Sequence, residues 1–247
     1  MRNYKSYTNL MQLAVMQMRG NTATLIVALI LQEMILLFVS SLASVLVPGT
    51  DTASMIIYYL VAFILQLAAG ILEAGTALLC LHCACGMPCK ISDLFYAFKK
   101  DTNKAIRIEF VLVIINCICT IPVNIYAYSV PASNTYEEML QYGMTMLPLM
   151  SVCILVYSVL TLPLFPVFYM MLDFPQCSVT ELLKRSFKVM KGNMLRLLLL
   201  KLCFIPMMFL SMFTCGLALL WVIPFMNVTC TNFYLDLMTC QKSVAQQ

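Results

Sequence analysis

Charged residues are scarce in this chain of 247 residues: they make up 11%, against about 25% in a typical soluble domain. Hydrophobic residues make up 62%, against roughly 45–50% in soluble domains. No polar stretch is long enough to fold on its own, which excludes a soluble domain carried by a single anchor. The net charge of +4 comes from basic residues beside apolar runs, where they indicate membrane orientation rather than nucleic-acid binding.

Recognisable catalytic motifs are also missing. The sequence contains no nucleotide-binding motif, no HExxH, no GxSxG and no pair of acidic residues placed for catalysis outside the membrane. His82 is the single histidine. We therefore expect a protein that is not an enzyme and that uses no cofactor.

Long apolar runs are what the sequence does contain. A helix needs about 20 mainly apolar residues to cross a bilayer, and six runs of this kind predict an all-α polytopic membrane protein with one domain, 1–247. The predicted transmembrane helices are Thr22–Val47, Met55–Ala84, Ile106–Tyr128, Thr145–Leu172, Met194–Phe213 and Gly216–Met238. The last run is the most polar, and Pro163 and Pro166 should kink or break the fourth.

Lysine and arginine fall in alternating gaps between these runs. Of the 15 basic residues, all except Lys201 lie in the N-terminal arm, around the gaps after the second and fourth runs, or in the C-terminal tail. The other three gaps contain no basic residue. Because cytoplasmic loops carry the excess of lysine and arginine, we expect a multi-pass protein of the cell membrane with both termini in the cytoplasm.

Short amphipathic helices are predicted on the cytoplasmic side. Ser178 and Glu181 form a capping box that starts one of them, and Gly192 ends it. Its basic side should contact anionic lipid head groups at the membrane interface. The stretch that ends at Gly20 is similar to it.

These similarities lead to the hypothesis of three parallel units, residues 1–88, 89–173 and 174–247. Each would contain an interfacial helix followed by one span out and one span back. The alternative is that basic cytoplasmic loops of any membrane protein imitate such a repeat.

Three charged side chains lie within the predicted spans: Glu33, Glu73 and Lys201. Glu33 is about 18 Å above Asn21 at a rise of 1.5 Å per residue, and the other two reach a similar level. An intramembrane charge should be paired or face water, so the three form either a proton or ion site or a structural ion pair. Glu109 lies near Arg107 at the interface and is assigned no role.

The stretch "CLHCACGMPC", residues 80–89, concentrates four cysteines and the histidine. Zinc sites usually combine two Cys-x2-Cys pairs, whereas only Cys80 and Cys83 form one here. Cysteines inside a membrane helix behave as small apolar residues. We therefore expect helix-end packing and no metal site, with a zinc site or a Cys–His nucleophile as the alternatives.

Two longer stretches, "YMMLDFPQCSVTELLKRSFKVMKGN" and "GLALLWVIPFMNVTCTNFYLDL", resemble a family of bacterial integral membrane proteins, chiefly from Firmicutes. The family is catalogued as a domain of unknown function and is distantly similar to the membrane domain of some glycerophosphodiester phosphodiesterases. The family signature residues that carry the resemblance are Tyr169, Asp173, Pro175, Ser186, Gly192, Asn193, Trp221, Pro224 and Tyr234. The resemblance implies the bacterial inner membrane and no established activity. Pro163 stands where the family often has an arginine.

Three functions remain open. The first is a non-catalytic membrane component that partners a transport or envelope system or a second copy of itself. The second is a small transporter or channel, which predicts a polar cavity between the first, second and fifth spans. The third is an intramembrane enzyme, which predicts that His82 faces a cavity near Cys85 or Cys89.

Overall fold

The computed structural model describes residues 4–46, 52–129 and 135–245, and these contain helices and no strand. The α-helices are α1 (Tyr7–Met18), α2 (Thr22–Leu46), α3 (Thr52–Ala84), α4 (Tyr96–Lys99), α5 (Thr102–Ser129), α6 (Tyr136–Thr161), α7 (Val167–Asp173), α8 (Val179–Met190), α9 (Met194–Leu202), α10 (Ile205–Met212) and α11 (Leu219–Ala245). The 3₁₀ helices are η1 (Ile91–Phe95) and η2 (Leu162–Leu164). The predicted all-α fold class is confirmed for the described residues.

Five stretches are long and apolar enough to cross a membrane, as expected for a multi-pass membrane protein. They are Thr22–Leu42, Ile56–Ala84, Thr102–Ser129, Tyr136–Asp173 and Met194–Met212. They correspond to the first five predicted spans. The sixth, Gly216–Met238, is not among them because Asn227, Thr229, Thr231 and Asn232 make the middle of α11 polar. A sixth crossing therefore stays a prediction.

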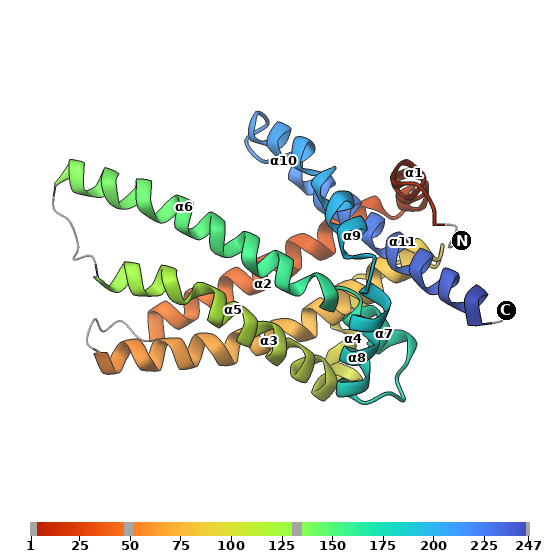
Figure 1. Cartoon of the computed structure of the whole chain (residues 1–247), viewed down its shortest axis with the longest axis horizontal. Coiled ribbons are helices and arrows are strands. Elements are labelled where there is room, and N and C mark those ends of the chain that lie inside the picture. The colour runs from red at the N-terminus through yellow and green to blue at the C-terminus, as the bar shows by residue number, and fades with distance from the viewer. Residues whose placement is uncertain (1–3, 47–51, 130–134, 246–247) are drawn as a thin grey trace.

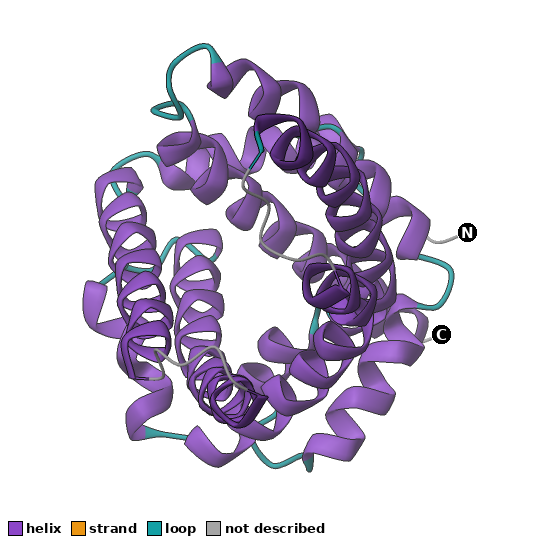
Figure 2. Ribbon diagram, turned by 90° about the vertical axis from the view of Figure 1, so that its left-hand side faces the viewer, coloured by secondary structure: helices purple, strands orange, loops and turns teal. Residues whose placement is uncertain are grey.

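Four long helices, α2, α3, α5 and α6, extend to one side of the molecule, and the shorter helices gather at the other end together with the long helix α11 (Figure 1). Figure 2 shows the same helices nearly end-on, as a bundle. Helix α3 is central: it packs against α2 on one side and α5 on the other, and also contacts η1, α7 and α11. Helix α1 and the C-terminal end of α11 lie together at the compact end (Figure 1).

The compact end contains most of the buried core. Leu10 of α1, Met170 of α7, Leu182 of α8 and Phe233 of α11 are each no more than 1% exposed and belong to one cluster. The far halves of the long helices expose many large apolar side chains instead, such as Phe38, which is 66% exposed. Such surfaces suit a lipid environment, in which apolar side chains need no protein cover.

Local signals position the short helices as expected. The Ser178–Glu181 capping box is present, with Ser178 N–H donating to Glu181 Oε2 (3.1 Å). Gly20 and Gly192 adopt φ values of +88° and +85°, which favour glycine and end the preceding helices. The proline pair interrupts the fourth span: α6 ends at Thr161 and α7 begins only at Val167.

Helix α8 differs from the expected interfacial arrangement in what covers its apolar side. Leu182, Ser186 and Met190 are buried, and the helix packs against η2 and α7. Lys184 and Lys188 on the other side are exposed. Protein covers Leu182 and Met190 on the apolar face of this helix, whereas Phe187 is 50% exposed.

Candidate functional site

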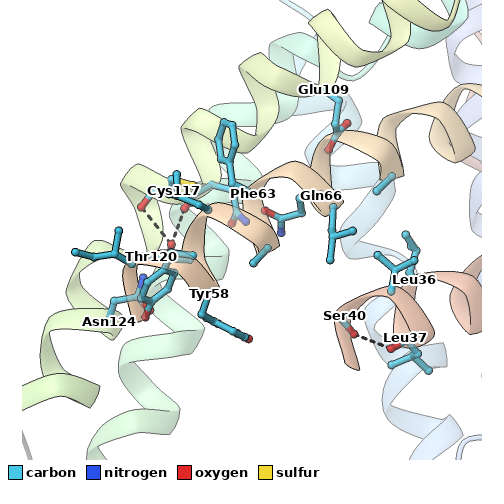
Figure 3. A pocket seen from close by; sticks show the side chains of 18 of the residues that line it. Leu36, Leu37, Ser40, Tyr58, Phe63, Gln66, Glu109, Cys117, Thr120 and Asn124 are labelled. Atoms are coloured by element: carbon cyan, nitrogen blue, oxygen red, sulfur yellow. Dashed lines mark hydrogen bonds between the residues drawn. The ribbon is translucent and has the colours of Figure 1, made fainter. Parts of the chain in front are cut away.

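A cavity of about 1180 Å³ lies between α2, α3 and α5. Carboxylates reach it from all three helices: Glu33 from α2, Glu73 from α3 and Glu109 from α5. Its lining extends from these glutamates to Ser40 and Tyr128, toward the far ends of the long helices (Figure 3). The cavity is therefore acidic at one end and continues along the length of three candidate membrane helices.

Polar residues at helical spacing line the cavity. On α5, Asn116, Thr120, Asn124 and Tyr128 recur every fourth position and face it. Figure 3 shows Thr120 and Asn124 on this face, with the Thr120 hydroxyl donating to the Asn116 carbonyl oxygen (2.9 Å). A polar stripe along a membrane-spanning helix normally faces protein or water rather than lipid.

Polar residues at helical spacing also line the cavity along α3. Tyr59, Gln66 and Glu73 recur every seventh position, which places them on one face of the helix. Ala62 and Ala69 lie between them and also line the cavity. Their small side chains leave the space that the polar side chains border.

Glu73 is held in place by a short hydrogen-bond chain. Gln32 Nε2 donates to Glu73 Oε1 (3.1 Å), and Gln32 Oε1 accepts a hydrogen bond from Thr76 Oγ1. Gln32 is 4% exposed, whereas the Glu73 side chain is exposed to the cavity. The buried amide thus fixes one carboxylate oxygen of Glu73 and leaves the rest of the group facing the cavity.

Glu109 lies where α5 comes closest to α3. A Cβ atom added to Gly70 would lie 2.3 Å from Glu109 Cβ, so only glycine permits this approach. Glu109 Oε2 is buried and has no hydrogen-bond partner among the described residues. Leaving a buried carboxylate oxygen unpaired costs free energy, and this oxygen is enclosed against Gly70 of α3 while the Glu109 side chain also borders the cavity.

The structure brings Glu33 and Glu73 to one cavity but puts Lys201 elsewhere. The Lys201 side chain is exposed on α9, and its Nζ lies 5.6 Å from the Phe165 ring centroid. It is not among the residues that line the cavity. The cavity itself lies between the first, second and third spans, whereas the transporter hypothesis expected the fifth.

Glu109 is the site residue that the sequence reasoning missed. Its assignment to Arg107 does not hold geometrically, because residues two apart on a helix point to different faces. The helical spacing that connects Glu109 to Asn116 and Thr120 was the available signal.

The first half of "CLHCACGMPC" packs at the end of α3, whereas residues 85–88 are exposed. Cys80 and Cys83 are fully buried, and His82 Nδ1 lies 2.9 Å from Asp93 Oδ2 of η1. Burial raises the pKa of the thiols of Cys85 and Cys89, which lie beyond the membrane-spanning part of α3. His82 does not line the cavity, and the described residues contain no group of three metal-ligating side chains.

The family signature residues form a packing network at the compact end. The Tyr169 and Tyr234 rings stack with centroids 5.1 Å apart, and Tyr234 OH donates to Asp173 Oδ2 (2.5 Å). Ser186 Oγ donates to the Pro163 carbonyl oxygen (2.5 Å), which joins α8 to η2. These contacts join α7 to α11 and α8 to η2.

The remaining signature residues are also structural. Asn193 Nδ2 donates to the Val189 carbonyl oxygen (3.2 Å), just after Gly192 ends α8. The Pro175 carbonyl oxygen accepts a hydrogen bond from Lys104, and Trp221 stacks on Phe225 with centroids 4.9 Å apart. Pro224 lies inside α11. None of the signature residues lines the cavity.

A second polar cluster at the compact end was not predicted. Arg196 Nη2 lies 2.8 Å from Asp236 Oδ2 and donates to the Lys5 carbonyl oxygen (2.6 Å). The Arg196 guanidinium also lies 4.4 Å from the Tyr4 ring centroid. The cluster joins the N-terminal arm to α9 and α11.

The comparisons with known proteins give one match. A family model described as "Protein of unknown function (DUF975)" matches residues 4–241. No curated protein matched the chain. No solved structure matched it either.

Proposed function

The chain belongs to the DUF975 family, and we propose that it is a small membrane transporter whose cavity between α2, α3 and α5 takes up a solute. The single observation that carries this proposal is the cavity of about 1180 Å³ with carboxylates from three helices. Ionisable side chains within membrane spans are costly and commonly mark substrate or ion pathways. Transporters also use interrupted helices, and the fourth and fifth candidate spans are both interrupted.

We propose further that the chain crosses the membrane six times, with both termini in the cytoplasm. The buried α11 would be the sixth crossing, since protein neighbours rather than lipid surround its polar residues. The alternating basic gaps support this orientation, and the exposed basic side of α8 would contact anionic lipid head groups. Three parallel units, the bacterial inner membrane and kinship with the phosphodiesterase membrane domain belong to the same proposal.

A second candidate function is a non-catalytic partner in a transport or envelope system. The observation that favours it is the position of the signature residues, which form packing contacts at the compact end and do not line the cavity. In this case the protein would act through a protein partner or a second copy of itself. The cavity would then be filled by lipid and would not need to admit water.

Labelling of Cys117 separates the two functions. Cys117 lines the cavity, whereas Cys119 on the same helix is 8% exposed and faces away. In variants that retain only one of these cysteines, a charged water-soluble thiol reagent should modify Cys117 in the reconstituted protein and leave Cys119 unmodified. Cys117 as unreactive as Cys119 would contradict the transporter and favour the partner role.

A further inference from the structure

We propose, resting on the transporter function above, that the cavity binds an amphipathic organic cation. The charge of the ligand follows from the lining residues. Glu33, Glu73 and Glu109 all line the cavity, and none of the lining residues is a lysine, an arginine or a histidine. Between membrane-spanning helices the effective dielectric constant is lower than in bulk water, so such carboxylates attract a positive charge more strongly than they would in solution.

The surroundings of Glu73 and Glu109 indicate where the positive charge would bind. Glu73 accepts a hydrogen bond from the neutral amide of Gln32, and none of the three salt bridges of the described residues includes Glu73 or Glu109. A cationic head group beside these side chains would supply the missing opposite charge. The ligand head group is therefore expected at the Glu73–Glu109 end.

The remaining walls favour an apolar body rather than a small hydrated ion. Tyr58, Tyr59 and Phe63 of α3 and Tyr128 of α5 present aromatic rings to the cavity. Aromatic faces attract organic cations, especially desolvated ones. Leu36, on the α2 wall, adds apolar surface (Figure 3).

The volume leads to the same ligand class. Cavities for drug-sized molecules measure about 300–1,000 Å³, and this cavity measures about 1180 Å³. A metal ion instead needs several oxygen ligands within about 2.6 Å, whereas the described residues contain no group of three or more acidic, histidine or cysteine side chains that could hold a metal ion. A ligand with an apolar body fits both the space and the walls.

Protection of Cys117 tests the proposal. In the variant that retains only Cys117, a neutral water-soluble maleimide measures access to the cavity. We expect tetraphenylphosphonium to slow the labelling in a saturable way, and tetraphenylborate, of the same shape and opposite charge, to leave it unchanged. The two ions are assayed separately so that they do not pair with each other.

Charge-neutral variants locate the head group. Glu73→Gln and Glu109→Gln should each raise the half-protecting concentration of tetraphenylphosphonium about tenfold, as expected for one lost charged interaction. Glu138→Gln is the matched control, because Glu138 is exposed in the first turn of α6 and does not line the cavity. It should leave the half-protecting concentration unchanged.

The outcomes separate this inference from the proposed function. If both ions slow the labelling of Cys117 equally, or if neither ion slows it, the ligand is not a cation. The transporter proposal is not affected by that result. Protection that persists unchanged in Glu73→Gln and Glu109→Gln also overturns the cationic ligand. If the maleimide does not reach Cys117 at all, the transporter itself fails.

Discussion

Gly70 of α3 controls how closely α5 can approach. Any larger residue would place its Cβ 2.3 Å from Glu109 Cβ, which is close to the α5 backbone and cannot rotate away. Gly75 plays the same part for η1, since a Cβ there would lie 1.8 Å from the Leu94 carbonyl oxygen. Small residues are a known means of close helix packing in membranes, and here they also bring Glu109 to the cavity.

Gly70→Ala should therefore lower the stability of the protein by about 1–3 kcal/mol, because overpacking forces the two helices apart. Gly143→Ala is the matched control, since Gly143 lies within α6 and a Cβ there meets nothing within 4 Å. Alanine is a better helix former than glycine, so this variant should be as stable as the parent or more so. The measurement is thermal unfolding in detergent; equal melting temperatures for both variants would refute the packing account.

For single residues, the sequence indicates which side chains can pack closely or carry charge, but not which residues of other helices they contact. The small residues around Gly70 permit a close helix contact, and the structure shows that α5 is the partner, which the sequence does not specify. The pairing of Glu73 with Gln32 joins α3 to α2, and nothing in a single sequence specifies which side chains from different helices meet. Glu109 was missed for the same reason, although its spacing from Asn116 was visible.

Among the elements, local signals predicted the helices well. Five of the six predicted apolar runs match candidate spans, and the proline pair predicted the break between α6 and α7. The interruption between α9 and α10 lies next to Pro206, in the first turn of α10. The burial of α8 depends on η2 and α7, whose positions no local pattern reveals.

The orientation of the helices across the membrane is testable with two exposed lysines. Lys99 of α4 and Lys188 of α8 are exposed in the structure and lie in basic gaps assigned to the cytoplasm. A membrane-impermeant amine reagent should modify both lysines in inside-out vesicles and neither in intact cells, with the modified sites read by mass spectrometry. Glu138→Lys, at the opposite end of the long helices, provides the control and should react in intact cells. Modification of Lys99 or Lys188 there would invert the orientation.

The two ends of the molecule differ in what they contain. The compact end contains the buried core and the network of Tyr169, Asp173 and Tyr234. The far end contains the cavity and the exposed apolar surface. The family model spans both ends, and α3 joins them, because it borders the cavity and also packs against α7 and α11 at the compact end.

If the protein is a transporter, water and not lipid occupies the space between α2, α3 and α5. Spin labels on cysteines introduced at Asn116 and Thr120 report on the cavity face of α5, and labels at Ile114 and Ile118 report on the opposite, exposed face. Collision rates with a water-soluble nickel complex and with oxygen, measured by electron paramagnetic resonance in bilayers, distinguish the two environments. We predict that the nickel complex reaches positions 116 and 120 and that oxygen dominates at 114 and 118. Oxygen dominating at all four positions would contradict the account.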